Sequence, residues 1–170
     1  GIFAAGSGSS VTNSGSLFGT GCGTTGIAVG INGSITNNGL VQLGGDGVGL
    51  VGDTGSNIVN TGRIVVGNDG IGIESRGNVT NSGTIIVGDG SGLTAGVLAL
   101  GDNLSVTNSG TIIGGTGVAG IAVAGNNGFL NNSGPITVGD FGVGLPAMGN
   151  CNSFPHSGPI HLGAAGPGIF

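Results

Sequence analysis

Positively charged side chains are almost absent from this sequence, in which Arg63 and Arg76 are the only Lys or Arg residues. A nucleic-acid site needs a basic patch, and two cations cannot build one. Long apolar runs are also missing: none reaches the ~18 residues of a membrane-spanning helix, and no charged segment precedes a short apolar one as in a signal peptide. We therefore expect no nucleic-acid partner and no membrane-spanning segment, and we interpret the chain as a processed form or an excised segment.

Proline is scarce, with 5 residues, and no strict Gly-X-Y period exists, so the 44 Gly do not indicate a collagen helix. A hydrophobic fraction of 37% with a net charge of only -5 is the opposite of the composition typical of disordered chains. The remaining interpretation is an ordered fold of many tight turns, in which Gly adopts positive φ. We expect one domain covering residues 1–170.

A phrase of the type Asn-Ser-Gly recurs through the chain, and "VTNSGTII" occurs twice, at 79–86 and 106–113. The glycines of the successive copies are 24, 23, 21, 27, 24 and 24 residues apart. These seven turn glycines are Gly15, Gly39, Gly62, Gly83, Gly110, Gly134 and Gly158. Repetition at this period is typical of solenoid proteins, whose repeats bury their apolar faces only by stacking on one another.

Each copy contains three short apolar stretches that are separated by Gly, Asn, Asp and Ser. Alternation that includes β-branched residues predicts half-buried strands, and no stretch has a helical period. Three strands in 21–27 residues favour a right-handed coil, because left-handed hexapeptide coils need shorter and stricter repeats. The predicted fold is all-β: a right-handed parallel β-helix, or β-solenoid, of about seven rungs of three short strands.

A polar column accompanies the turn glycines, two residues before each of them. Its members are Asn13, Asn37, Asn60, Asn81, Asn108 and Asn132, with His156 in the seventh copy. Stacked amides can donate and accept hydrogen bonds along the coil axis, so we predict a buried ladder that ends at His156. We also predict that the turn glycines take a backbone conformation that a Cβ would disfavour.

The phrase "TNSGTI", together with segments such as "GDGVGLV" and "GNDGIGI", resembles the passenger repeats of bacterial autotransporter and filamentous-haemagglutinin-type adhesins. The resemblance covers nearly the whole chain. It implies a secreted, surface-exposed β-helical stalk or fibre, often adhesive. The sequence departs from a complete autotransporter because it has no outer-membrane barrel segment, which implies a passenger fragment or a separately secreted subunit.

The sequence begins and ends with "GIF", and both triplets fall at the same phase of the repeat. Two copies could therefore continue one ladder head to tail, through an interface formed by Gly1, Ile2, Phe3, Gly168, Ile169 and Phe170. A heterologous contact that does not close gives a filament. The other interpretation is a fragment cut between rungs, with Pro155, Pro159 and Pro167 as a partial cap. Val65, Ile86 and Ile113 face away from the core column and could form an apolar stripe for lateral bundling.

Candidate chemical sites are few. Cys22 and Cys151 lie some five rungs apart, too far for an internal disulfide, which leaves an intersubunit bridge or free thiols. Acidic residues recur six or seven positions after four of the turn glycines, at Asp46, Asp69, Asp89 and Asp140. They could bind Ca²⁺ through a column of carboxylates, or accept local hydrogen bonds in turns, which we favour.

Catalysis is not expected, because Glu74 is the only Glu and has no acidic partner at a fixed spacing. His156 and His161 lack metal ligands nearby, so we expect no metal and no cofactor. We expect a structural protein: a subunit of a bacterial extracellular or cell-surface fibre that polymerises with itself. The alternative is the stalk of a secreted autotransporter-type adhesin that contacts host glycan or protein through Gly88–Gly96.

Overall fold

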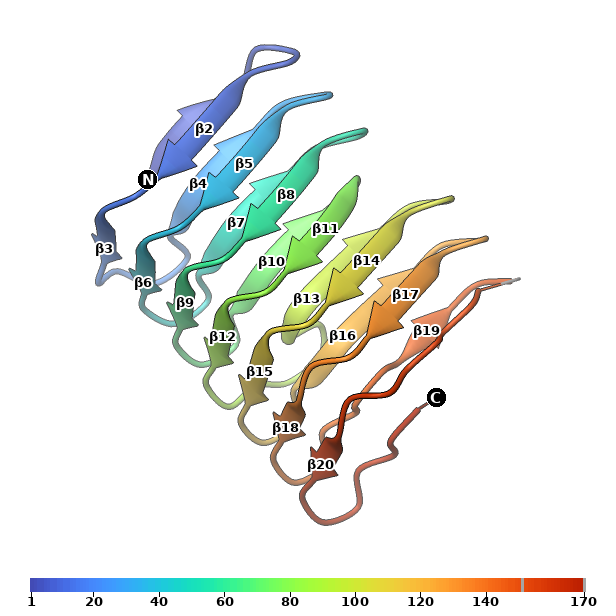
Figure 1. The fold of residues 1–170 in the computed structure, drawn as a ribbon. Helices are drawn as coiled ribbons and strands as arrows, with labels where there is room; N and C mark the ends of the chain where they lie inside the picture. The colour runs from blue at the N-terminus through green and yellow to red at the C-terminus, as the bar shows by residue number, and fades with distance from the viewer. Residues whose placement is uncertain (151, 170) are drawn as a thin grey trace.

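The structure, a computed structural model, describes residues 1–150 and 152–169. Its chain winds into successive coils that stack along one axis (Figure 1). The strands form three sheets, which we name sheets A, B and C. Sheet A contains β1 (Ile2–Ala4), β4 (Thr25–Val29), β7 (Val48–Gly52), β10 (Ile71–Ser75), β13 (Ala95–Leu100), β16 (Ala119–Ala124) and β19 (Ala147–Met148). Sheet B contains β2 (Ser10–Asn13), β5 (Ser34–Asn37), β8 (Asn57–Asn60), β11 (Asn78–Asn81), β14 (Ser105–Asn108) and β17 (Phe129–Asn132). Sheet C contains β3 (Ser16–Gly19), β6 (Leu40–Leu43), β9 (Arg63–Val66), β12 (Thr84–Val87), β15 (Thr111–Gly114), β18 (Ile136–Val138) and β20 (Ile160–Leu162).

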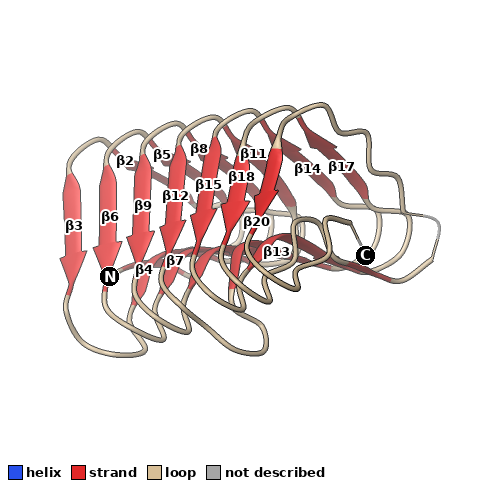
Figure 2. Cartoon of the chain, turned by 90° about the horizontal axis from the view of Figure 1, so that it is seen from below, coloured by secondary structure: helices blue, strands red, loops and turns tan. Residues whose placement is uncertain are grey.

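Each strand up to β16 pairs in parallel with the strand three positions further along the chain, so each of the first six coils contributes one strand to each sheet. In the last coil β18 pairs with β20, because among the described residues no strand of sheet B lies between β19 and β20. Figure 2 shows the consequence, with β3, β6, β9 and their successors forming one continuous side of the coil. The repeats keep their register: Ile85 lies beside Ile64 and Ile112, and Val79 lies beside Ile58 and Val106. The prediction of an all-β parallel solenoid with about seven turns of three strands is confirmed.

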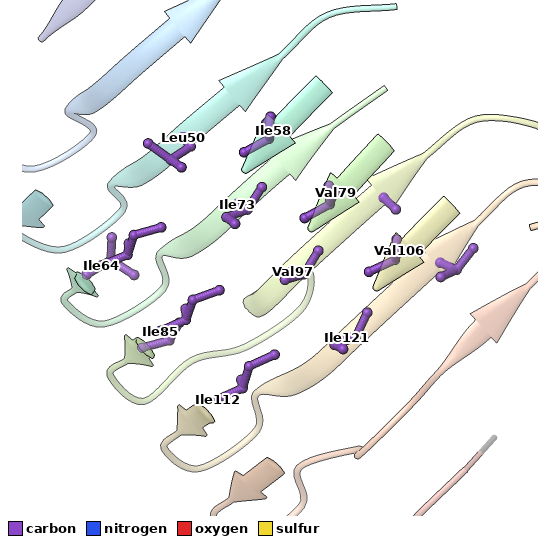
Figure 3. Close-up of a cluster of buried hydrophobic side chains, with 14 of the residues drawn as sticks. Leu50, Ile58, Ile64, Ile73, Val79, Ile85, Val97, Val106, Ile112 and Ile121 are labelled. Atoms are coloured by element: carbon purple, nitrogen blue, oxygen red, sulfur yellow. The ribbon is translucent and has the colours of Figure 1, made fainter. Parts of the chain in front are cut away.

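The core is a stack of aliphatic columns that come from all three sheets and meet inside the coil (Figure 3). In one coil, for example, Ile73, Val79 and Ile85 are at most 1% exposed. Burying such a side chain contributes about 1.5–3 kcal/mol relative to leaving it in water. Because every coil adds one set of these residues, the period-two alternation within each strand specifies the inward face of the whole stack.

The three corners of the coil differ. Sheet B turns into sheet C through the tight Asn-Ser-Gly corner, whereas the other two corners contain residues with left-handed backbone conformations. Asp46 and Asp69 hold these positions between sheets C and A, with φ values of 53° and 57°. Asn32 does so between sheets A and B, with φ 55°. Asp and Asn tolerate this conformation better than other residues with a Cβ, which explains their recurrence in the turns.

The turn glycines do not have the conformation that we predicted. Among the described residues, eight Gly have positive φ, and no turn glycine is one of them. The reason for Gly is close packing between coils: a Cβ on Gly110 would collide with the carbonyl oxygen of Gly83 and lie 2.7 Å from the carbonyl carbon of Ser82. The prediction of an unusual dihedral angle was therefore wrong, although the preceding coil still excludes a Cβ at every turn glycine except Gly15 in the first coil.

The outer faces of the three sheets carry different side chains. Sheet B presents mainly Ser, Thr and Asn, such as Thr12, Thr36 and Thr80 in one register. The outer face of sheet A is apolar and includes Val48, Ile71 and Ala95 in one register.

The described residues of the structure contain no helix long and apolar enough to cross a membrane.

Candidate functional site

An uninterrupted ladder of asparagine side chains runs along the corner between sheets B and C. In each bond the Nδ2 of one Asn donates to the Oδ1 of the Asn in the next coil, and all five bonds are 2.7 Å long. The ladder joins Asn13, Asn37, Asn60, Asn81, Asn108 and Asn132. All six side chains are buried. The sequence spacing alone located these residues.

Each ladder amide also stabilises its own corner. The Nδ2 of Asn108 also donates to the carbonyl oxygen of Gly110, with 3.1 Å between nitrogen and oxygen. Asn132 Nδ2 donates in the same way to Gly134 O, at 2.9 Å. No described buried side-chain nitrogen or oxygen lacks a hydrogen-bond partner. An amide is the side chain that can donate twice and accept along one axis, so this corner favours Asn in every coil.

The ladder has a direction. Every Nδ2 points toward the C-terminal coils and every Oδ1 toward the N-terminal coils. The two ends of the ladder are therefore chemically different, with an acceptor at Asn13 in the first coil and a donor at Asn132 in the sixth, beyond which His156 holds the same position in the seventh coil. A second copy stacked on the seventh coil would place its Asn13 beside His156 and not beside Asn132, so the amide ladder is interrupted at such a junction.

His156 occupies the seventh position of the column, where its backbone pairs in parallel with that of Asn132. Unlike the six asparagines, it is exposed. In the described structure, the Nδ2 of Asn132 bonds to Gly134 and not to the imidazole. The prediction that His156 is in register agrees with the structure, but its side chain is not a hydrogen-bonded terminus of the ladder.

The residues predicted for the end-to-end interface lie at the open edges of sheet A. Ile2 of the first coil pairs with Ile27 of the second, and Ile169 pairs with Leu145 beyond the last full coil. Gly1 packs against the backbone of Thr25, and Gly168 against that of Gly144. Both triplets thus belong to one column of the coil, as the sequence predicted. The last residue of the second triplet, Phe170, lies outside the described residues.

The apolar character of these edges is pronounced. Phe3 is 70% exposed, Ile2 40% and Ile169 50%. At the N-terminal edge, β1, β2 and β3 each have a hydrogen-bonded neighbour on one side only. Unpaired strand edges are templates for pairing with further strands.

The four recurrent aspartates divide between two neighbouring columns, whereas the sequence analysis treated them as one. Asp46 and Asp69 occupy the position of the turn that has a left-handed backbone conformation. The hydrogen bond from Asp46 N to Asn68 O shows that Asn68, and not Asp69, stands one position before this column. Asp89 and Asp140 occupy the preceding position, in one column with Asn68 and Thr116. The two columns correspond to the two spacings in the sequence, because Asp46 and Asp69 lie seven residues after their turn glycines and Asp89 and Asp140 lie six.

These carboxylates accept hydrogen bonds from the backbone of the next coil. Asp89 Oδ1 accepts from Thr116 N at 2.8 Å, and Asp140 Oδ1 from Ala164 N at 2.7 Å. Within the described part of the chain, no group of three or more His, Cys, Asp or Glu could hold a metal ion. The geometry favours the structural role of the aspartates over the calcium site.

Replacing Asp89 with Ala should lower the free energy of unfolding by about 1 kcal/mol, because Thr116 N loses its acceptor. Asp89→Asn keeps an oxygen at the same place and should change stability by less than about 0.5 kcal/mol. Urea unfolding followed by circular dichroism measures both. A loss for Asp89→Asn equal to that for Asp89→Ala would show that charge, and not the acceptor, matters at this turn.

Cys22 is a free and exposed thiol in the first turn between sheets C and A. Its proposed intersubunit partner, Cys151, lies outside the described residues, so the bridge remains a prediction. The exposed apolar stripe on sheet C is present only in part. Ile113 is 40% exposed, whereas Val65 and Ile86, in the same register, are half-buried.

A hollow on the outer face of sheet A was not predicted. It has a volume of about 170 Å³, and its walls include Leu93 of the wide loop 88–94, Leu98, Ala119, Val143 and Met148. Leu98 is only 2% exposed although it faces away from the core. The long apolar stretches "AGVLAL" and "AGIAVA", without strict alternation, were the available signal for strands buried on both faces.

Comparisons with protein families, curated proteins and solved structures find no match to this chain. Its class therefore comes from its architecture. The three parallel sheets and the register of the repeats define a parallel β-solenoid.

Proposed function

We propose that this chain is a structural subunit of a bacterial extracellular or cell-surface fibre, in which solenoids stack head to tail through their open coil edges. The observation that carries the proposal is the open first coil, in which β1, β2 and β3 each have a hydrogen-bonded neighbour on one side only. The direction of the asparagine ladder adds that the two ends of the stack are unlike. The coil is proposed to be right-handed, as about 98% of parallel strand crossovers are.

The backbone supports the same arrangement. In the first coil, the carbonyl groups of Ser9 and Asn13 accept hydrogen bonds from Ser34 and Asn38 of the second coil. Because peptide groups alternate in direction along a strand, those of Ser10 and Thr12 face the open side. They can bond to a preceding coil of the same geometry. A contact between unlike ends does not close, so it produces a filament.

Stacking two copies brings two segments to one position of sheet A. Sheets B and C of one copy end with its seventh coil, whereas residues 168–169 already continue sheet A past Leu145. In the next copy, β1 occupies the equivalent position before β4. Only one of these two segments can remain at the junction, so assembly requires the other to be displaced.

Gly15 provides a test that separates assembly from folding. It is the turn glycine of the first coil, and a Cβ there would meet nothing within 4 Å in a single copy. In a head-to-tail stack, that Cβ would meet the corner of the preceding copy, as a Cβ on Gly39 would meet Gly15 O. Gly15→Ala should therefore leave the single rod folded and reduce filament formation by at least about tenfold.

Negative-stain electron microscopy and sedimentation velocity of the 170-residue chain measure this effect. The matched control is Ser14→Ala, the exposed neighbour of Gly15 in the same corner, which removes a hydroxyl group and adds no atom. Wild-type protein that stays a monodisperse single rod at high concentration would refute the proposal. Filaments of Gly15→Ala equal to wild type would refute this geometry of the junction.

The second candidate is the stalk of a secreted autotransporter-type adhesin that contacts host glycan or protein. The wide loop 88–94 and the hollow beside it favour this candidate, because they interrupt an otherwise regular surface. If the chain is such a stalk, the Gly15→Ala protein should still bind its target although it stays a single rod. A loop shortened by residues 90–93 would lose that binding.

A further inference from the structure

All the carboxylate side chains of this protein lie on one side of the coil. The chain has seven Asp and Glu residues. Four lie in the turns from sheet C to sheet A, two in the turns from sheet A to sheet B, and one on the outer face of sheet A itself. They are, in that order, Asp46, Asp69, Asp89 and Asp140; Asp53 and Asp102; and Glu74. The tight corner between sheets B and C carries none.

The face between the two acidic margins is apolar. Val48, Ile71, Ala95, Ala119 and Val143 form one outward column. A second outward column contains Ala28, Val51, Leu98 and Ala122, and Glu74 interrupts it. Ala95, Leu98 and Ala122 make a small hydrophobic cluster separate from the core.

Two hollows interrupt this face. The hollow of about 170 Å³ lies between the wide loop and β16. The other, of about 230 Å³, lies beside Phe3, Ala28 and Asp53 near the first coils. Both are large enough to receive apolar side chains, and the second has a carboxylate in its wall.

Four of these carboxylates use only one of their two oxygens, Oδ1, in backbone hydrogen bonds, so Oδ2 can face a bound polypeptide. Asp69, Asp89, Asp102 and Asp140 each use Oδ1 to accept a backbone N–H from a neighbouring coil. These four side chains are exposed, and the bonds hold them in fixed positions along the margins. A strand of six residues such as β13 spans ~20 Å, so the apolar strip is about as wide as one or two extended peptides.

We propose that the outer face of sheet A binds a basic amphipathic polypeptide segment, whose apolar side chains enter the hollows and whose Lys and Arg side chains meet the acidic margins. Charge complementarity carries this assignment. A second copy is a poor occupant, because these segments hold seven carboxylates against the single cationic side chain of Arg76. The surface is separate from the coil edges, so the proposal does not depend on head-to-tail stacking.

The test is fluorescence anisotropy with a labelled 12-residue peptide in which Lys alternates with Leu and Val. Its counterpart, with Glu in place of Lys, is the control peptide. The Lys peptide should bind the folded chain, and its affinity should fall by at least about tenfold when NaCl rises from about 50 to 500 mM. Equal binding of the Glu peptide, or no binding of the Lys peptide at about 100 μM protein, would overturn the proposal.

Two kinds of variant locate the binding surface. Ala119→Arg places a bulky cation in the hollow and should abolish binding, whereas Thr137→Arg adds the same charge to the outer face of sheet C in the same coil. The triple change Asp89→Asn, Asp102→Asn and Asp140→Asn removes three charges but keeps the side-chain oxygens that accept backbone N–H bonds. We expect it to bind the Lys peptide about tenfold more weakly. Circular dichroism confirms that each variant is folded.

Other outcomes identify another occupant or site. If Thr137→Arg weakens binding as much as Ala119→Arg does, sheet A is not the binding face and the proposal fails. If the rods pair in sedimentation experiments without peptide, and Ala119→Arg abolishes that pairing, the occupant is a second copy and the proposal fails. Retained affinity in the triple Asp→Asn variant would show that charge does not select the partner.

Discussion

Asn81→Leu is expected to lower the free energy of unfolding by about 4 kcal/mol, because it leaves one buried polar group without a hydrogen-bond partner in each of the two neighbouring coils. Asn81 accepts from Asn60 and donates to Asn108, with both bonds at 2.7 Å in a buried column. Leucine has a similar volume but no polar atoms, so Asn60 Nδ2 and Asn108 Oδ1 each lose a partner away from water. A buried polar group without a partner costs about 1–3 kcal/mol.

Urea unfolding at equilibrium measures this loss. The matched control is Asn131→Leu, two coils further along sheet B, which removes an exposed asparagine one position before Asn132. We expect a change below about 0.5 kcal/mol for this control. Equal effects of the two substitutions would mean that the ladder does not stabilise the fold.

Gly110→Ala should be the second strongly destabilising change, with a loss of about 3 kcal/mol or more. The added methyl group would overlap the carbonyl oxygen of Gly83 and lie 2.8 Å from its nitrogen. Because both atoms belong to the backbone of a paired coil, neither can move without disturbing the hydrogen bond from Thr111 N to Gly83 O.

The control for this prediction is Gly15→Ala, in the same corner of the first coil. No atom lies within 4 Å of the added methyl group there. Its unfolding free energy should stay within about 0.5 kcal/mol of wild type in single rods. A comparable loss at both positions would indicate that the corner excludes alanine through its backbone conformation and not through contact between coils.

The overall architecture was readable from the sequence because each structural requirement recurs. Asn81 and Gly83 alone would indicate no more than a turn. The same pair in successive copies fixes the register, because a slip by one residue would expose Ile85 and bury Thr84. The half-buried strands followed from the same alternation.

The features that sequence analysis missed depend on local turn geometry. Asp89 lies six residues after its turn glycine and Asp69 seven, and the register of the coils shows that these two spacings are two columns. The wide loop 88–94 places Leu93 beside Leu98, and nothing in the repeat predicts how that loop is placed. His156 keeps the register of the column but is exposed in the last coil.

Electron cryomicroscopy of assembled wild-type protein tests the central claim most directly, since it resolves the junction between two copies. We expect the coil spacing of ~4.8 Å to continue through the junction without a gap, with the copies repeating every ~34 Å. The map should also show one strand, not two, between β19 of one copy and β4 of the next. Isolated rods alone, or rods joined only along their sides, would contradict the claim.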